Sequence, residues 1–289
     1  LYHSRYSGFL SRRLLRRHCR RLGISRLIAF NAENAEIAVR ARIDGAVALN
    51  VRGTKFSTDP RLAERYREAA AKCESLITNS ANTALLIQKL GIAEKSRITI
   101  IHNGIELPPI EFSPRSKTVL YVGSIKKVKD PMTFVKACRE VAGEDEEVRI
   151  VMAGDGDMKP LVERYIREHR LDGNFRLLGE VPYGEIPYKE ASVFVNSSLR
   201  ESSCNSLLEA LSFGIPVVAA DNPGNRDILS GLAHHRLVPV SDSTEMAAAI
   251  RFFLNAGPGL RKTIFEESRE LIREHYSVSK MVDEYLDSF

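Results

Sequence analysis

Residues 192–228 read SVFVNSSLRESSCNSLLEALSFGIPVVAADNPGNRDI and decide the fold. A short apolar, β-branched run leads into a polar loop at 197–204, after which an amphipathic stretch begins near Asn205 and ends at Gly214. A second apolar run, 215–220, follows and leads into another polar turn. A strand, a helix and a buried strand in this order predict a parallel βαβ unit. Polar loops at the carboxyl ends of such strands line a ligand crevice.

The same alternation extends along the rest of the chain. Apolar runs predict strands at 26–30, 46–51, 75–79, 97–102, 118–122, 148–153, 175–179, 192–196, 215–220 and 236–240. Amphipathic stretches predict helices at 60–74, 81–90, 131–142, 158–169, 205–213 and 244–255, and at 261–289 with a break near Tyr276 and Ser277. Asp130 before Pro131 is typical of an N-cap followed by proline in the first helical turn. We therefore predict an α/β protein whose parallel sheets are covered by helices on both faces.

A proline-containing segment with little periodicity, 103–117, is typical of a linker between two doubly wound halves. We expect a partial first domain that includes the linker at 1–112, and a complete second domain at 113–289. The final helix, about 277–289, is a candidate to cross back to the first domain. Because the chain begins with Leu1 and its first half has about four strands, we expect the first domain to be truncated at its start.

Composition excludes several classes of protein. Hydrophobic residues make up 44% of the chain and charged residues 27%, which excludes a disordered or low-complexity chain. No apolar run approaches the length of about 18 residues that a membrane-spanning helix requires. The four cysteines, Cys19, Cys73, Cys138 and Cys204, are at least 50 residues apart. This spacing favours reduced thiols over a zinc site or a disulfide framework.

Positive charge is concentrated at the start of the chain. The net charge is +5, but residues 1–26 contain eight arginines, from Arg5 to Arg26, and no acidic residue, so the remainder carries −3. Arginine pairs at 12/13, 16/17 and 20/21 alternate with a helically spaced apolar set: Phe9, Leu10, Leu14, Leu15, Cys19 and Leu22. Such a cationic amphipathic helix is typical of a solvated surface helix or, as the second interpretation, of contact with an anionic membrane surface. No aromatic residues interleave the arginines, so we expect no nucleic-acid partner.

Several familiar catalytic motifs are absent from the sequence. There is no G-x-x-x-x-G-K-[ST], no G-x-S-x-G and no H-E-x-x-H, and no third glycine follows Gly154 and Gly156 to complete a dinucleotide fingerprint. Asp155, Gly156 and Asp157 form a D-x-D sequence, which can hold a divalent metal. Because they follow a strand, where glycine and aspartate are common turn and cap residues, we expect no metal site.

The start of the helix at 205–213 has features suited to a phosphate. Unpaired amides and the helix dipole favour an anion there, and Asn205 or Ser203 is expected to cap the helix. Glu201 lies in the preceding loop and Glu209 one turn inside the helix, so both can point to one side. A carboxylate accepts two hydroxyl hydrogen bonds, which fits ribose or hexose diols. The alternative for either glutamate alone is a solvated charge or a salt bridge.

Residues 200–218, RESSCNSLLEALSFGIPVV, resemble the signature of retaining GT-B glycosyltransferases, especially glycosyltransferase family 4 (glycosyl transferases group 1). That signature has two glutamates separated by seven residues, then an alanine and a G-x-P-V-V strand. Further segments resemble motifs of the family in the same order along the chain: 102–106 (HNGIE), 121–123 with 126–131, 154–156 (GDG), 175–179 (FRLLG) and 222–227 (NPGNRD).

The resemblance implies a GT-B protein with two Rossmann-like parallel-sheet domains facing a cleft. Its reaction would transfer a sugar from a UDP- or GDP-linked donor, with retention of anomeric configuration, to a polysaccharide, lipid-linked or small-molecule acceptor. No cofactor and no dissociable metal would be needed. Two alternatives are another GT-B sugar-nucleotide enzyme, such as an epimerase or phosphorylase, and a non-catalytic nucleotide-sugar-binding protein.

The resemblance also implies roles for individual residues. Lys129 and the amides at 202–206 would bind the diphosphate, Glu201 the sugar hydroxyls and Glu209 the ribose, with Lys129 and Glu201 as catalytic residues. The family's arginine after the first strand of the second domain is replaced by Ser124, and the glycine after its first glutamate by Ser202. The full donor-binding set is Gly123, Ser124, Lys129, Gly154, Leu178, Val181, Glu201, Ser202, Ser203, Cys204, Asn205, Ser206 and Glu209, with the base near Leu178 and Val181.

Location and activity follow as expectations from the same resemblance. We expect a cytoplasmic protein of cell-envelope polysaccharide biosynthesis, peripheral on the inner face of the membrane through the helix that carries Arg12 to Arg21. We expect donor binding by 113–289 and little transfer by the 289-residue chain, because a truncated first domain would lack most of the acceptor surface.

Overall fold

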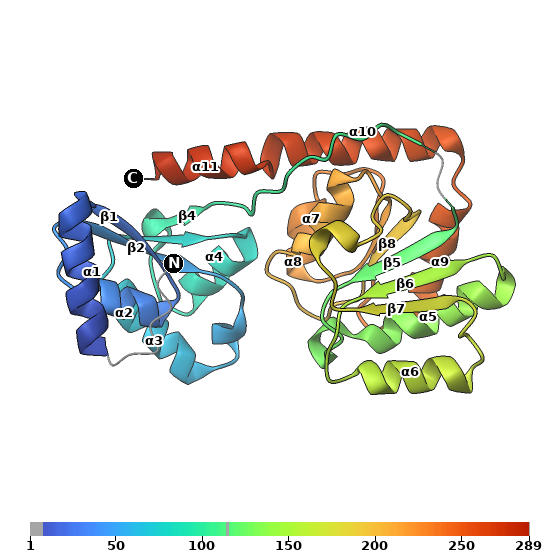
Figure 1. Ribbon diagram of the computed structural model, residues 1–289, viewed down its shortest axis with the longest axis horizontal. Coiled ribbons are helices and arrows are strands. Elements are labelled where there is room, and N and C mark those ends of the chain that lie inside the picture. Colours follow the sequence, from blue (N-terminus) through green and yellow to red (C-terminus); the bar gives the residue numbers. More distant parts are fainter. Residues whose placement is uncertain (1–7, 114–115, 289) are drawn as a thin grey trace. The chain divides into compact units, whose positions relative to one another are not determined.

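The computed structural model describes residues 8–113 and 116–288, in two compact units (Figure 1). Unit 1 consists of Leu1–His102 and Met281–Phe289, and unit 2 of Asn103–Lys280. Both units have a parallel sheet with α-helices between most successive strands, so the predicted α/β class is confirmed. Arg5 and the side chain of Phe9 lie outside the described residues.

Unit 1 has a four-stranded parallel sheet in the order β1-β2-β3-β4. The strands are β1 (Arg26–Phe30), β2 (Ala46–Val51), β3 (Ser75–Thr78) and β4 (Ile98–Ile100). Helices α2 (Ala32–Arg40), α3 (Pro60–Ala70) and α4 (Ala81–Lys89) connect them, with short 3-10 turns at Lys55–Ser57 and Lys95–Arg97. The sequence did not predict α2, because its buried residues are the alanines Ala32, Ala35 and Ala38, which give a weak hydrophobic period.

The sheet of unit 1 is buried on both faces. Leu49 of β2 lies in a cluster with residues of α2, α3 and α4. The preceding residue, Ala48, lies in a second cluster on the other face of the sheet. That second cluster includes Met281 and Tyr285 of α11 (Val278–Asp287), the helix that ends the described chain.

Helix α1 (Gly8–Leu22) packs against α2 and departs from the predicted pattern. Cys19 is buried and Leu15 is half-buried, but Leu10 is 54% and Leu14 44% exposed. The predicted amphipathic helix is present, but its apolar set is only partly buried. Leu15 and Cys19, four residues apart, occupy the buried face, and Leu10 and Leu14 lie to one side of it, among the arginines. Among the described residues, no helix has the length and apolarity needed to cross a bilayer.

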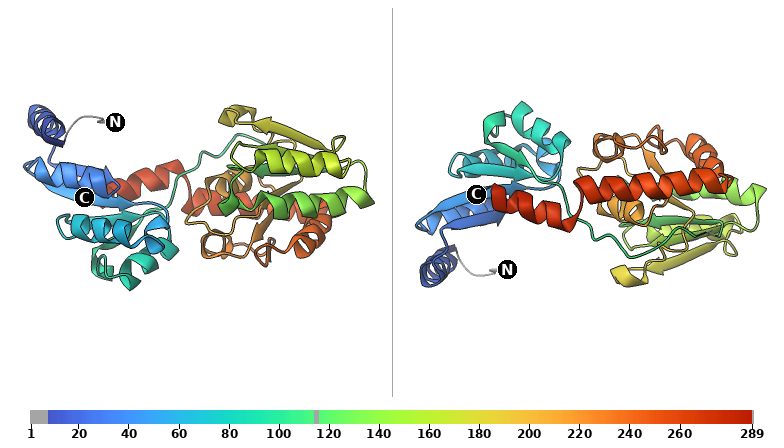
Figure 2. Two further views of the ribbon diagram at one scale, coloured as in Figure 1. Left: turned by 90° about the horizontal axis from the view of Figure 1, so that it is seen from below. Right: turned by 90° about the horizontal axis from the view of Figure 1, so that it is seen from above.

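Unit 2 has a six-stranded parallel sheet in the order β10-β9-β8-β5-β6-β7. The strands are β5 (Thr118–Val122), β6 (Arg149–Ala153), β7 (Phe175–Gly179), β8 (Val193–Asn196), β9 (Val217–Ala220) and β10 (Arg236–Val238). The helices are α5 (Pro131–Glu144), α6 (Lys159–Glu168), α7 (Asn205–Ser212), α8 (Pro223–Leu229), α9 (Ser243–Leu254) and α10 (Pro258–His275). Two 3-10 turns lie at Lys127–Lys129 and Tyr183–Glu185. Figure 2 shows the predicted break between α10 and α11.

Alternate residues of the central strand β5 face opposite layers of helices. Val119 and Tyr121 pack in a cluster with residues of α5, α6 and α9, whereas Leu120 packs with residues of α7, α8 and α10. Figure 1 shows α5 and α6 on one side of this sheet and α7 and α10 on the other. Because both faces are covered, ligands can reach the sheet only at the ends of its strands.

The carboxyl ends of β5, β6 and β7 approach one another closely. The Gly123 amide donates to the Ala153 carbonyl (3.0 Å), the Ile125 amide to the Asp155 carbonyl (2.8 Å) and the Gly154 amide to the Gly179 carbonyl (2.7 Å). Gly154 has a φ of 140°, and a Cβ there would lie 2.0 Å from the Gly123 carbonyl oxygen. Glycine is therefore required at this position for the two turns to meet.

Gly154→Ala is expected to lower the free energy of unfolding by about 1–3 kcal/mol, because the new methyl group meets backbone at a φ that alanine rarely adopts. Urea unfolding measures the change. Gly173→Ala is the matched control, since a Cβ at Gly173 meets nothing within 4 Å. Equal stability losses in the two variants would contradict the requirement for glycine at position 154.

Candidate functional site

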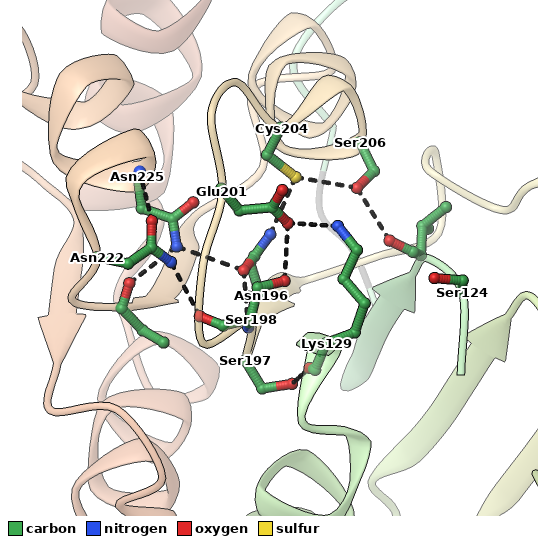
Figure 3. A network of polar contacts seen from close by, with 12 residues as sticks. Ser124, Lys129, Asn196, Ser197, Ser198, Glu201, Cys204, Ser206, Asn222 and Asn225 are labelled. Atoms are coloured by element: carbon green, nitrogen blue, oxygen red, sulfur yellow. Dashed lines mark hydrogen bonds and ion pairs between the residues drawn. The ribbon is translucent and has the colours of Figure 1, made fainter. Parts of the chain in front are cut away.

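The candidate site surrounds the loop between β8 and α7, whose backbone is held by buried asparagine side chains. The Asn196 carboxamide oxygen accepts from the Ser198 amide (3.0 Å), and Asn222 Nδ2 donates to the Ser198 carbonyl (2.9 Å) (Figure 3). Asn225 Nδ2 donates to the Ala220 carbonyl (2.8 Å) and, at 3.3 Å, to Asn196 Oδ1. These contacts attach the loop to the start of α8.

Helix α8 contacts the loop directly at Gly224. A Cβ at Gly224 would lie 2.5 Å from the Glu201 carbonyl oxygen and 2.9 Å from the Glu201 Cβ. The sequence predicted only a turn here, because residues 223–229 are short and begin with proline and glycine. The first turn of α8 thus determines where the Glu201 backbone lies.

Glu201 and Lys129 form an ion pair. Lys129 Nζ lies 2.5 Å from Glu201 Oε1, and the Ser198 hydroxyl donates to the same oxygen (2.7 Å) (Figure 3). The side chain of Glu201 is 9% exposed and that of Lys129 26% exposed. Burial alone would lower the pKa of Lys129, but the neighbouring carboxylate raises it above its usual value, so the ammonium stays charged.

The turn that carries Lys129 is attached to the same loop. The Leu199 amide donates to the Val128 carbonyl (2.9 Å), and the Ser197 hydroxyl donates to the Lys129 carbonyl (2.8 Å). The pair is therefore fixed on both sides by backbone contacts between the loops that follow β5 and β8.

Glu209, the second glutamate, has a different partner. The Tyr188 hydroxyl donates to Glu209 Oε2 (2.5 Å), and the buried Tyr188 ring stacks on Phe213 with centroids 5.1 Å apart. Burial raises the pKa of Glu209, and the hydrogen bond from Tyr188 partly offsets that rise. The sequence did not predict Tyr188 as a site residue, because it lies in the irregular segment before β8 and belongs to no periodic pattern.

The start of α7 differs from the prediction in its cap. The N-cap residue is Cys204, without a side-chain cap hydrogen bond, so the prediction that Asn205 or Ser203 caps the helix is wrong. Asn205 Oδ1 instead accepts from Asn103 Nδ2 (2.6 Å), and the Ser206 hydroxyl donates to the Val122 carbonyl (2.9 Å). The first amides of any α-helix lack intrahelical acceptors and can bind an anion. Anion binding at this terminus remains a prediction.

Cys204 is buried beside these groups. Its sulfur accepts from Asn196 Nδ2 (2.9 Å), and burial raises the pKa of the thiol to about 11. The protonated thiol is therefore a packing group rather than a nucleophile at neutral pH.

Asp130 and Ser124 complete the turn after β5. Asp130 precedes α5 as predicted, but its carboxylate accepts from the hydroxyls of Thr133 and Ser241 (2.7 Å each) rather than from helix amides. The reason is its left-handed backbone, with φ 44°. The Tyr121 hydroxyl donates to the Ser124 carbonyl (3.1 Å) and thereby fixes the turn at the position where the family pattern has arginine.

The first aspartate of the D-x-D segment is held by contacts within the same turn. The Asp155 carboxylate accepts from the Gly156 amide (2.7 Å) and from Lys159 Nζ (3.0 Å), and these contacts lower the pKa of Asp155. Within residues 8–113 and 116–288, no three His, Cys, Asp or Glu side chains are grouped as metal ligands. Leu178 is in β7 and Val181 lies two residues beyond it, at the same edge of the sheet as Gly123 and Gly154.

The fold and these contacts define a parallel α/β protein with a polar site at the carboxyl ends of β5 and β8. The family model for Glycosyl transferases group 1 matches residues 106–271, more than half of the chain, and the chain belongs to this family. The resemblance inferred from the motifs is thereby confirmed.

Two curated relatives illustrate the family. The 2-deoxystreptamine N-acetyl-D-glucosaminyltransferase of Niallia circulans is 30% identical over 116 residues, which are 39% of this chain and 30% of the relative. The alpha-monoglucosyldiacylglycerol synthase of Streptococcus pneumoniae is 28% identical over 176 residues, 60% of this chain and 39% of the relative. The chain thus matches well under half of the length of either relative.

Two solved structures share the fold at low sequence identity. Anabaena Alr3699/HepE in complex with UDP superposes with a TM-score of 0.81 at 15% identity, covering 96% of this chain and 82% of that one. TarM of S. aureus superposes with a TM-score of 0.79 at 19% identity, covering 95% and 57%. The predicted GT-B fold class is confirmed.

Tyr188→Phe is expected to lower the free energy of unfolding by about 1–3 kcal/mol at neutral pH, because Glu209 then lies buried and charged without its donor. Loss of the hydrogen bond raises the pKa of Glu209 further above the unfolded value. A protein with a carboxyl whose folded pKa is raised becomes less stable as pH rises through that pKa. The loss of unfolding free energy in the variant should therefore be smaller in acid.

Urea unfolding at neutral and acidic pH measures both effects. Tyr165→Phe serves as control, since the Tyr165 hydroxyl accepts from the cationic Arg139 (3.4 Å). A cost for Tyr188→Phe that does not change with pH would contradict the coupling to Glu209.

Proposed function

We propose that this protein transfers a sugar from a nucleotide-sugar donor to an acceptor with retention of anomeric configuration, and that residues of unit 2 bind the donor. The observation that carries the proposal is the ion pair of Lys129 with Glu201 in the loop before α7, together with Glu209 on α7 itself, in a chain of this family. Because the chain matches only part of its curated relatives, the proposal concerns donor binding first and the complete reaction second.

Each of these groups has a proposed role. Lys129 and the amides at 202–206 stabilise the diphosphate, Glu201 accepts hydrogen bonds from donor-sugar hydroxyls, and Glu209 accepts from the ribose. The backbone near Leu178 and Val181 contacts the base. UDP is the first nucleotide to test, because the Anabaena structure with the same fold is a complex with UDP.

The proposed chemistry is electrostatic. Negative charge grows on the departing diphosphate as the sugar becomes oxocarbenium-like, and cations or amides aimed at that charge lower the barrier. The backbone that carries Lys129 is held at the Val128 and Lys129 carbonyls, so only the side chain has to turn from Glu201 toward the diphosphate. With lysine and a helix terminus at the diphosphate, the proposal requires no dissociable metal.

A thermal-shift screen of the full chain against UDP-, GDP-, ADP- and dTDP-sugars tests donor binding. A ligand at 100 times its Kd should stabilise the protein by about 2.7 kcal/mol. Glu209→Ala should weaken nucleotide affinity by about 1–3 kcal/mol, since hydrogen bonds to a charged acceptor are lost. Glu190→Ala, at an exposed position of unit 2, is the matched control. Unchanged nucleotide affinity in Glu209→Ala would refute the assignment of this site.

The acceptor and the location belong to the same proposal. We propose a lipid-linked acceptor in cell-envelope biosynthesis and a position at the inner face of the cytoplasmic membrane, held there by α1. The supporting surface is one side of α1, where Leu10 and Leu14 are exposed beside Arg13, Arg17 and Arg21. Exposed leucines flanked by arginines suit the boundary between anionic headgroups and acyl chains. Three curated relatives have lipids in their names.

Flotation with anionic vesicles measures this binding. Each arginine near an anionic surface contributes about 1 kcal/mol, so replacing Arg13, Arg17 and Arg21 with Gln should reduce binding about 100-fold at low salt. Replacing Arg61, Arg65 and Lys72, exposed residues of unit 1, with Gln removes the same charge elsewhere and should have a much smaller effect. Absence of binding by the unmodified chain at low salt would leave α1 as a solvated surface helix.

A further inference from the structure

Glu201 and Lys129 are proposed to bind different parts of the donor, yet they already bind each other. Both the Lys129 ammonium (2.5 Å) and the Ser198 hydroxyl (2.7 Å) contact Oε1 of Glu201. In this arrangement the Glu201 carboxylate and a diphosphate would compete for the Lys129 ammonium. A phosphate that draws the ammonium toward itself weakens its contact with Glu201.

Little movement is available to relieve that competition. The Glu201 backbone lies directly on Gly224, and the amide and carbonyl of Ser198 are both held by asparagine side chains. The Glu201 side chain is only 9% exposed, so water compensates poorly for a lost partner. A carboxylate that loses its cation at this position is therefore both close to the phosphates and short of hydrogen-bond donors.

A nucleoside diphosphate and a nucleotide sugar differ in the hydrogen-bond donors that they bring to Glu201. A nucleoside diphosphate brings negative charge and no sugar hydroxyls. An intact nucleotide sugar brings hydroxyl donors, which replace the ammonium as partners of the carboxylate. When the nucleotide sugar binds, its hydroxyl groups replace the ammonium as partners of Glu201. When the nucleoside diphosphate binds, nothing replaces the ammonium.

We propose that Glu201 determines the preference of this site for an intact nucleotide sugar over the nucleoside diphosphate released by transfer. The inference rests on the proposed function and extends it, because it assigns to Glu201 an unfavourable interaction with the product as well as a favourable one with the donor. Specificity of this kind comes from an unpaired charge against the wrong ligand.

Isothermal titration of the full chain with UDP, UDP-glucose and UDP-N-acetylglucosamine tests the proposal. Glu201→Gln keeps the shape of the side chain and removes its charge, so the variant should bind UDP about tenfold more tightly, equivalent to about 1.4 kcal/mol. The better-bound nucleotide sugar should gain less or lose affinity, so the ratio of the two dissociation constants should fall. Glu190→Gln, which removes the same charge from an exposed position of unit 2, should leave that ratio unchanged.

A second variant, at Ser198, should change UDP affinity in the opposite direction. Ser198→Ala removes the partner that Glu201 keeps when Lys129 turns to phosphate, so this variant should bind UDP several-fold more weakly. Thermal unfolding of each variant establishes that it is folded.

Two results would overturn the proposal, and they are distinguishable. Equal or weaker UDP binding by Glu201→Gln, with affinity still lost in Glu209→Ala, would refute the role of Glu201 and leave the proposed function standing. Failure of the unmodified chain to bind any of the three nucleotides would refute both.

Discussion

The carboxylate of Glu201 is held almost out of contact with water, and the loops around it are organised to satisfy that charge. A buried carboxylate without partners is very costly, and Lys129 and Ser198 supply a cation and a hydroxyl to one of its oxygens. These partners come from different strand-to-helix connections, so their meeting requires that β5 and β8 lie side by side in the sheet. The order of strands is therefore what makes the ion pair possible.

The two glutamates illustrate how the same side chain acquires different properties in one helix–loop unit. Glu201 contacts a cation, whereas the Glu209 carboxylate accepts from the neutral Tyr188 hydroxyl, and burial raises the pKa of Glu209. A charge balanced by lysine exchanges partners when an anion arrives. A charge supported by a tyrosine donor keeps its partner while it accepts hydroxyl groups. This difference is the physical basis for proposing that one residue discriminates between ligands and the other anchors them.

Backbone proximity is the second constraint on the site, and glycines provide it. Gly154 lets the turn after β6 contact the turn after β5, and Gly224 lets α8 contact the Glu201 loop. The buried amides of Asn196, Asn222 and Asn225 then fix the loop without introducing charge. Rigid neutral hydrogen bonds hold the backbone, while the charged side chains Lys129 and Glu201 pair with each other.

The sequence by itself determined the parallel α/β class, most strands and helices and the family, and it identified Lys129, Glu201 and Glu209 as candidate site residues, because periodicity and motif spacing are local properties. It missed α2, whose buried residues are alanines, and α8, which is short and begins with proline and glycine. Only the tertiary structure decided that Lys129 contacts Glu201, 72 residues away, that Tyr188 supports Glu209, and that Leu10 and Leu14 are exposed. Those contacts depend on which strands are neighbours and which face of a helix is covered, and neither property is encoded by residues adjacent in the sequence.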